Sequence, residues 1–389
     1  MELQSRDAPL PPFFAAVRRR HPDIGIVLLP PELPADEPID QPATEKQLAN
    51  AFDLTTGTAT RAWAEAVGDG QLPESRFAFG PDEDTVTVRA RVSARLDGSP
   101  LVLLAAALAP SGWEVGQRPG DVSQLVAHRA TMQLVASYAV ASGAFVLTAS
   151  STPRTVGVDR TRELVRIDDG ATRVAADEVD LDRRITDLMA AEEVARVLGP
   201  GTIGNRDGVP AWARDAANRV ALSRDLAGWG DRDDQGLLTD DERQWLVNAR
   251  AARDALAAIE RGTDPQTLDD VTSQLYVYDP TAFDGDGAIA VAAGDLATAT
   301  DIALTVPRFG ADAQSAPFHA ARALDLYEST RSADGAGGVA VMSWIGSGAD
   351  RLADLLDGLR ASRDDDPAHL TLIDVDEPRT IADGPGPLI

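Results

Sequence analysis

Alternating apolar and polar positions mark one strand clearly in the first part of the chain. In "TVTVRARVSARL" (85–96), valine and alanine alternate with threonine and arginine. This period of two is typical of a strand with one buried face. The apolar run "LVLLAAALA" (101–109) follows the turn signal "GSP" and predicts a second, more buried strand. "GWEVGQ" (112–117) predicts a third.

Helical patterns complete this N-terminal region. "DVSQLVAHRATMQLVASYAVAS" predicts a helix that begins at a capping Asp121, and "TEKQLANAFDLTTGTATRAWAEAV" (44–67) predicts another. Before them, "FFAAVRRRHPDIGIVLLPP" predicts a helix followed by a strand, Ile24–Leu29. We therefore expect residues 1–165 to form a small α+β domain with an antiparallel sheet.

Residues 166–270 read as a helical connecting segment. The helix that starts after Pro210 has apolar residues on one face: Trp212, Ala216 and Val220. A second helix opens at Thr239, and its apolar residues follow a helical period: Trp245, Ala249, Ala252, Leu256 and Ile259. We expect the two helices to pack as an antiparallel pair.

Strand-like runs and helical runs alternate in residues 271–389. The strand-like runs are "QLYVYDP", "GAIAVAAGD", "DIALTVPRFG", "GGVAVMSWIG" and "AHLTLIDV", with helical stretches between the last three. Strand–helix–strand–helix–strand predicts βαβ units in a parallel sheet. The fold class expected for the whole chain is therefore α/β, preceded by the helical segment and the small α+β domain.

Composition narrows the function. The 389 residues carry a formal net charge of -26, which repels phosphate backbones and anionic lipids, so we expect no nucleic acid and no membrane as partners. There is no cysteine, which excludes disulfides and thiolate metal sites. No secretory signal and no ~20-residue apolar span is evident. We expect a cytoplasmic protein, with signal-less export left open, and no cofactor.

One acidic stretch, "DRDDQGLLTDDE", resembles a calcium loop. Asp231, Asp233, Gln235 and Glu242 fall at positions 1, 3, 5 and 12 of the EF-hand pattern, although Gln235 stands where Asp or Asn is usual. The same residues have a simpler interpretation. Thr239 and Glu242 form the T-x-x-E capping box of the second helix, so that Glu242 needs no metal.

The segment after the strand 302–306 is a candidate oxyanion loop. It consists of Val306, Pro307, Arg308, Phe309 and Gly310. Hydrolases of the α/β type place backbone donors for an oxyanion at this point. Proline and glycine also simply end strands, which is the more economical interpretation of the position by itself.

The segment "HLTLIDVDEP" (369–378) occupies the place of a nucleophile elbow. Such an elbow, G-x-S-x-G, needs its glycines because the turn is strained. Here Asp374 and Pro378 replace the glycines, and Asp376 stands at the position of the nucleophile. Aspartate can be a nucleophile, but the glycines are absent, and no histidine follows Asp376. The sequence contains no recognisable Ser-His-Asp triad.

Taken together, "IGNRDGVPAWARDAANR", "GDLATATDIALTVPRFG", "VAVMSWIG" and "HLTLI" resemble an actinobacterial α/β-hydrolase family of uncharacterised function over roughly residues 191–373. Its members read "IGNLDGVP…RD.AN", "VPG.G", "WLGYDAP" and "HLTVIGHSYGS". The resemblance implies that Val306-Pro307 and Gly310 belong to the oxyanion loop, with Arg308 in place of a glycine. It also implies that the family's serine falls at Asp376.

These departures lead us to expect an incomplete α/β-hydrolase-like sheet in residues 271–389, either degenerate or encoded by a reading frame that ends early. The leading hypothesis is a catalytically incomplete protein with a binding or accessory role. The alternatives are an active serine-type esterase or lipase-like hydrolase, and a type VII secretion-linked interaction or chaperone-like protein. With no strand beyond 369–375, we expect this strand to be an exposed edge that pairs with a partner or a second copy.

Overall fold

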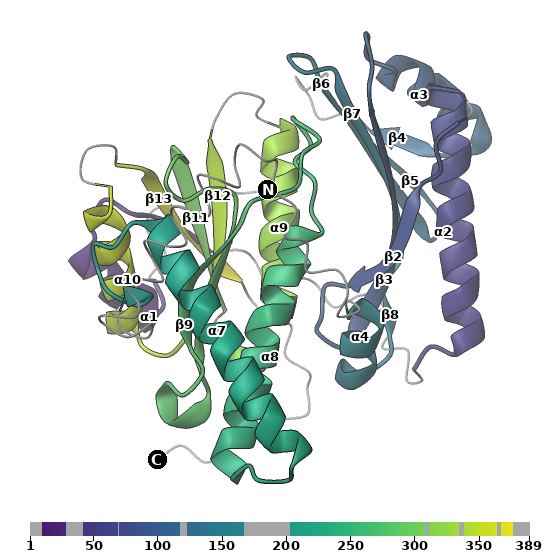
Figure 1. Cartoon of the computed structure of the whole chain (residues 1–389). Helices are drawn as coiled ribbons and strands as arrows, with labels where there is room; N and C mark the ends of the chain where they lie inside the picture. The colour runs from purple at the N-terminus through teal and green to yellow at the C-terminus, as the bar shows by residue number, and fades with distance from the viewer. Residues whose placement is uncertain are drawn as a thin grey trace, which may run out of the picture.

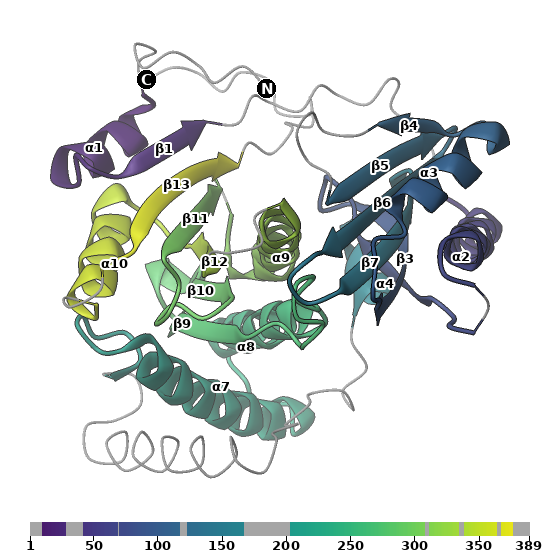
Figure 2. The ribbon, with the colours of Figure 1, turned by 90° about the horizontal axis from the view of Figure 1, so that it is seen from above.

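The computed structural model describes residues 10–28, 42–68, 70–116, 123–166, 203–307, 311–333, 338–363 and 367–375. Within them the chain forms two β-sheets that lie on either side of helix α9, Ala316–Ala333 (Figures 1 and 2). We call the mixed sheet, built mainly from the C-terminal half, sheet A, and the antiparallel sheet from the N-terminal half sheet B. No helix in the described part of the chain combines the length and apolar character needed to cross a bilayer.

Sheet B is antiparallel throughout, with strand order β2-β3-β7-β6-β5-β4 and β8 paired to β3. Its strands are β2 (Glu74–Phe79), β3 (Thr85–Arg95), β4 (Glu114–Gly116), β5 (Gln124–Arg129), β6 (Met132–Ala139), β7 (Ala144–Ser151) and β8 (Arg154–Thr155). Helix α2 (Glu45–Ala66) packs on one face, where Trp63 stacks on Phe145 at 5.5 Å between ring centroids. The alternation in 85–96 predicted β3 correctly.

The expected strand at 101–109 is instead helix α3 (Leu101–Leu108). Leu101, Leu104 and Leu108 are buried against α2 and the sheet, while Val102 and Leu103 are exposed. Leucine and alanine have high helix propensity, and leucines at i, i+3 and i+7 share one helix face. The run is therefore apolar on every face of a helix of which only one face is buried.

The helix expected from Asp121 is also wrong. The described part of that stretch is a hairpin of β5 and β6, and Asp121 lies outside the described residues. Leu125 and Ala127 point inward from one strand and Leu134 and Ala136 from the other. The turn contains Ala130 at a φ of 47°, without the glycine or asparagine that usually signals a hairpin.

Sheet A has the order β1-β13-β11-β12-β10-β9. Its strands are β1 (Gly25–Leu28), β9 (Ser273–Asp279), β10 (Ala288–Ala293), β11 (Asp301–Pro307), β12 (Val339–Ile345) and β13 (His369–Val375). The first four in spatial order are parallel, and β10 runs antiparallel to both of its neighbours. The predicted βαβ units are present, and the class α/β with an antiparallel sheet beside it is confirmed.

Helices cover both faces of sheet A. Helix α8 (Asp240–Glu260) and helix α9 (Ala316–Ala333) bury one face, while α1 (Pro12–Arg20) and α10 (Ala349–Ala361) bury the other. Helix α7 (Ala211–Asp234) packs along β9 and against α8, where Trp229 lies 5.9 Å from Trp245. The expected helical pair is therefore present, and it belongs to the packing of sheet A.

The strand 369–375 is not an exposed edge. Strand β1 pairs in parallel with β13, from Gly25 opposite Thr371 to Leu28 opposite Asp374. A short apolar strand carries no signal that identifies its neighbour, which is why the sequence placed it in the antiparallel domain. Residues 12–28 therefore pack in sheet A and outside the domain expected for 1–165. The other limits of the three expected domains, 1–165, 166–270 and 271–389, stay predictions.

Polar contacts between α1 and α10 hold β1 in place. Arg20 bonds Asp354 at 2.7 Å, and Arg360 bonds Asp23 at 2.6 Å. The buried His21 lies between them, with Nε2 3.2 Å from the carbonyl oxygen of Ala353. Helix α1 and β1 thus form a unit that closes one side of sheet A.

The outward face of β3 docks on α9. Arg89 forms a bidentate ion pair with Asp325, and Arg91 donates a hydrogen bond to Glu328 at 2.6 Å. Phe79 and Phe318 add an edge-to-face contact at 5.6 Å. Asp325 keeps the pKa of Arg89 above its usual range. The arginine side of the alternating strand therefore faces sheet A's helices instead of solvent.

Removing residues 1–28 should expose the edge of β13 and raise the solution mass of the protein above that of the full chain, because an unpaired strand edge recruits another strand. Size-exclusion chromatography with light scattering measures this. Removing only residues 1–9 leaves α1 and β1 in place and serves as the matched control. An unchanged mass after the longer deletion would show that β1 does not protect β13.

Candidate functional site

The carboxyl ends of the parallel strands in sheet A form the candidate site. Strands β11 and β12 are neighbours, yet α9 and α10, which follow them, lie on opposite faces of the sheet (Figure 2). Open α/β sheets bind ligands outside the carboxyl ends of strands at such a reversal. Strand β13 lies on the other side of β11, so the segments after β11 and β13 begin next to each other.

The positions assigned to an oxyanion loop and a nucleophile begin at this point. Val306 pairs with Asp374, and Pro307 pairs with Val375, the last residues of their strands. Arg308, Phe309 and Gly310, which follow β11, and Asp376, which follows β13, lie outside the described residues. The sheet therefore brings the starts of both candidate segments side by side, and their geometry beyond these strands stays a prediction.

Asp374 is the most informative residue at this edge. Its side chain is fully buried, at 0% exposure, and it sits in strand register between Leu28 and Val306. A glycine is needed here in a nucleophile elbow so that strand and helix can pack closely. The structure instead accommodates a buried carboxyl-bearing side chain, which a protein tolerates only with polar contacts around it.

The "WIG" motif at the end of β12 has a packing role. Trp344 and Ile345 are buried on opposite faces of the sheet. A Cβ atom on Gly346 would lie 2.7 Å from the indole of Trp344, which is too close for any side chain. Trp344 therefore requires glycine two residues later, and this part of the resemblance reflects steric fit.

Three of the chain's four histidines lie away from the strand ends. His21 is buried between α1 and α10, His128 is exposed on β5, and His369 begins β13 at the opposite end of the sheet. His319 lies in the first turn of α9, after β11, and is 2% exposed, with its ring against Phe318 at 5.0 Å. It is the histidine whose element starts at the candidate site.

The segment "IGNRDGVPAWARDAANR" closes the other edge of sheet A. Asn205 accepts from the backbone N–H of Tyr278 at 3.1 Å and donates to its carbonyl oxygen at 2.8 Å. Asp215 accepts from the N–H of Leu275 at 2.6 Å, and Asn218 donates to the Leu275 carbonyl oxygen at 2.9 Å. These side chains occupy the backbone groups that a further strand would otherwise pair with.

Arg214 is the centre of this clamp. Its side chain is 2% exposed, and its Nε donates to the carbonyl oxygens of Gly204 at 2.8 Å and Tyr276 at 3.1 Å. The guanidinium lies 4.0 Å from the centre of the Tyr276 ring, a cation–π contact. A Cβ atom on Gly204 would lie 1.7 Å from Oδ1 of Asn218, so the chain needs glycine there. The motif shared with the resembled family is thus structural in this chain.

The calcium-like stretch adopts the capping arrangement. Asp231 and Asp233 lie within α7, and Glu242 bonds the backbone N–H of Thr239 at 2.9 Å, which completes the capping box at the start of α8. The Glu242 carboxylate also bonds Arg232 at 2.9 Å. Gln235 is the C-cap residue of α7. Across the described ranges, no cluster of three or more histidine, aspartate or glutamate residues is arranged to hold a metal ion.

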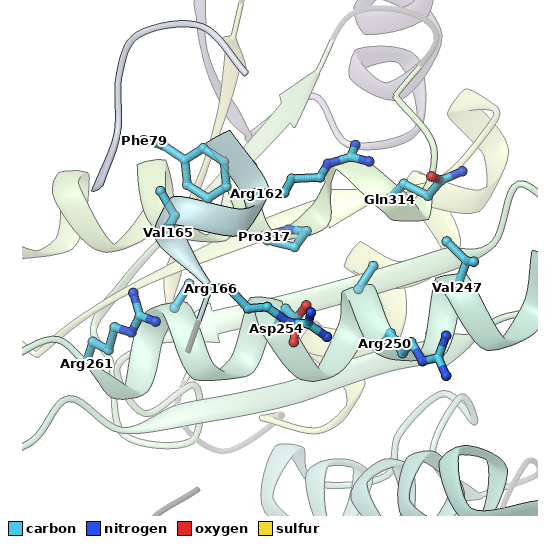
Figure 3. A pocket seen from close by; sticks show the side chains of 12 residues that line it. Phe79, Arg162, Val165, Arg166, Val247, Arg250, Asp254, Arg261, Gln314 and Pro317 are labelled. Atoms are coloured by element: carbon cyan, nitrogen blue, oxygen red, sulfur yellow. The ribbon is translucent and has the colours of Figure 1, made fainter. Parts of the chain in front are cut away.

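A second concave site lies between the two sheets and was not evident in the sequence. It has a volume of about 190 Å³, and one helical stripe of α8 forms its floor (Figure 3). Helix α4 (Val158–Val165), the end of β2 and the start of α9 form its walls. Its residues come from four separate segments, so no local pattern could have revealed it. We call it the α8 pocket.

No family model matches the chain. Over 177 residues it is 31% identical to two proteins of Mycobacterium tuberculosis, "Uncharacterized protein Rv2079" of strain H37Rv and "Uncharacterized protein MT2140" of strain CDC 1551. The matched region covers 41% of this chain and 26% of each relative. The chain therefore aligns with about a quarter of the length of these mycobacterial relatives, and their names assign no activity.

Replacing Arg214 with methionine should lower the free energy of unfolding by about 1–3 kcal/mol, because the buried carbonyl oxygen of Tyr276 loses its donor. The carbonyl oxygen of Gly204 keeps a donor in Asn218. Urea denaturation followed by circular dichroism measures this. Arg224→Gln, whose side chain on the same helix is 58% exposed, is the control and should change stability by less than ~0.5 kcal/mol. Equal effects of the two substitutions would contradict the clamp.

The pKa of Glu242 is lowered from 4.5 to about 2, chiefly by the hydrogen bond from Arg232 and then by the backbone N–H of Thr239. Because the folded pKa lies below the unfolded one, this carboxylate stabilises the fold above about pH 4.5, and the contribution is lost as pH falls toward 2. An NMR titration of the side-chain carboxyl carbon should show this. Arg232→Gln should raise the pKa toward 4.5, whereas Arg243→Gln, which removes the partner of Asp240, should not.

Proposed function

We propose that this chain is an α/β-hydrolase-like protein that does not perform Ser-His-Asp catalysis by itself and acts as a binding or accessory protein. The buried Asp374 carries this proposal. It fills the position where an elbow requires glycine, and β1 and β11 enclose it on both sides. A strained, exposed turn needs space at this residue, and the packing around Asp374 is that of a regular strand.

The hydrolase-like part of the proposal is supported by how the matched motifs are arranged. From β9 onward, the strands of sheet A lie in the spatial order β9-β10-β12-β11-β13. This arrangement sets the end of β11, at Pro307, beside the end of β13, at Val375. An oxyanion loop and a nucleophile turn must start from neighbouring strands to act on one carbonyl group. The strand arrangement therefore suits an oxyanion loop beside a nucleophile turn. The sequence, however, lacks the serine and the glycines of a nucleophile elbow.

The positions of His21, His128 and His369 support a non-catalytic role. A general base must lie within hydrogen-bond reach of its nucleophile. His369 is at the opposite end of β13 from Val375, and His128 belongs to sheet B. His21 uses its two ring nitrogens for contacts with Ala353 and Arg360. These three histidines have structural or surface positions that do not serve chemistry at the strand ends.

The purified chain should not hydrolyse p-nitrophenyl butyrate above the background rate and should not be labelled by a fluorophosphonate probe. A commercial serine esterase tested in parallel shows that both assays work. Turnover that disappears in Asp376→Ala would reject the proposal and would make Asp376 a nucleophile. Turnover that persists in Asp376→Ala but disappears in His319→Ala would also reject it, by locating catalysis elsewhere at the strand ends.

A further inference from the structure

The α8 pocket has an apolar body. Phe79 from β2, Val165 from α4 and Pro317 from α9 face the floor, on which Val247 is 37% exposed (Figure 3). The small side chains of Ala251 and Ala258 leave space above the part of α8 that forms the floor. A partly exposed valine on a helix that is otherwise packed between sheets leaves apolar surface available to a ligand.

Positive charge surrounds this apolar surface. The pocket is lined by four arginines, Arg162, Arg166, Arg250 and Arg261, and by one acidic residue, Asp254. Asp254 is bonded to Arg253 at 2.8 Å, so it is already engaged with a neighbour outside the pocket lining. The whole chain has a formal net charge of -26, so a cavity lined by four arginines differs from the rest of the protein in the sign of its charge. Four arginines around one cavity favour the binding of an anion there.

Two of these arginines have ordinary partners. Arg162 bonds Glu83 at 2.5 Å, and Arg250 lies 3.4 Å from Asp233. For the guanidinium groups of Arg166 and Arg261, the described residues offer no carboxylate within ion-pair distance. These two groups therefore retain hydrogen-bond donors for an external anion.

Arg261 is the least compensated of the four. Burial, and then repulsion from Arg76, lowers its pKa to about 10, and the more distant Asp254 and Glu74 offset only part of this. Arg76 donates to the backbone carbonyl oxygen of Arg261, which keeps the two cations close. An anion bound beside Arg261 would offset this repulsion and favour the charged guanidinium.

The floor is elongated. Val247 and Arg261 are fourteen residues apart on one stripe of α8 and its C-cap, which corresponds to about 21 Å along the helix axis. Apolar and charged residues alternate along this stripe, and Asp254 is the one carboxylate among them. The shape suits a ligand with an extended apolar chain and one charged end.

We propose that the α8 pocket binds a single-chain amphiphile with an anionic head group, of the class of medium- or long-chain carboxylates. The apolar chain runs along α8 from Ala258 toward Ala251, between Phe79 and Pro317. The carboxylate accepts hydrogen bonds from Arg261. The pocket lies between α8, α4 and the start of α9, and the proposal does not depend on whether the chain has hydrolase activity.

Calorimetric titration of the full chain with decanoate, below its micelle concentration, tests the proposal. We expect saturable binding that weakens as sodium chloride rises, because a charge contact at a partly exposed site is screened. Decan-1-ol, which has the same chain without the charge, should bind at least about tenfold more weakly, equivalent to ~1.4 kcal/mol.

Variants separate this pocket from non-specific binding. Arg261→Gln should weaken decanoate binding at least about tenfold, and Ala258→Asn, on the floor one turn before Arg261, should weaken decanoate and decanol alike. Arg243→Gln is the matched control, because Arg243 lies on the same helix outside the pocket and pairs with Asp240. It should leave the affinity unchanged. Circular dichroism melting of each variant confirms that the fold is intact.

Several results would overturn the proposal. They are the absence of saturable decanoate binding, equal affinity for decanol, and an Arg261→Gln variant that is folded and binds like the Arg243→Gln control. If Arg261→Gln fails to fold, Arg166→Gln replaces it, since Arg166 is exposed at the rim and its loss does not disturb packing. The esterase assays above use different substrates and variants, so the two proposals fail independently.

Discussion

The backbone groups along the two edges of sheet A are the constraint on which this structure depends. A buried N–H or C=O group without a partner costs ~1–3 kcal/mol, and a free strand edge invites other chains. The chain meets this constraint differently on each side. Side chains of the segment before and within α7 bond the backbone of β9, and a real strand, β1, bonds that of β13. Both solutions use segments distant in sequence from the strand they protect.

The same arrangement explains how sheet B is attached. Sheet A ends in the four-residue strand β1 on one side and in the covered strand β9 on the other. Sheet B joins sheet A through the helices on its face, where the arginines of β3 pair with carboxylates of α9. Half-exposed ion pairs contribute modestly to stability, but several in register fix orientation. The α8 pocket is the space left where α4 and the end of β2 do not reach the floor.

Periodicity predicted the elements that bury a regular face. The alternation of 85–96 gave β3, the helical period from Thr239 gave α8, and the βαβ pattern gave β11 to β13. Periodicity failed where the residue types do not indicate which side chains are buried or where the chain turns. Leu101–Leu108 is apolar on all sides yet exposes two of its large side chains, and the hairpin at Ala130 turns without a glycine.

Other features could not be read from the sequence because they depend on which segments meet. The sequence of Gly25–Leu28 contains no pattern that identifies β13 as its neighbour. The arginines of the α8 pocket are separated by up to about a hundred residues. The motif around Arg214 was visible as a family resemblance, but its role as an edge clamp required the positions of Tyr276 and Leu275. The capping box at Thr239 was predictable because both of its partners lie within one helical turn.

The pairing of β1 with β13 also sets an order of events during synthesis. Helix α1 and β1 leave the ribosome well before their partners α10 and β13, since His21 and Arg360 are 339 positions apart. Closing so long a loop is slow relative to local folding, and until then the apolar face of α1 has nothing to cover it. Sheet B, whose strands are close in sequence, can form in the meantime. The apolar face of α1 therefore stays uncovered until α10 has been made, and exposed apolar surface of this kind promotes aggregation.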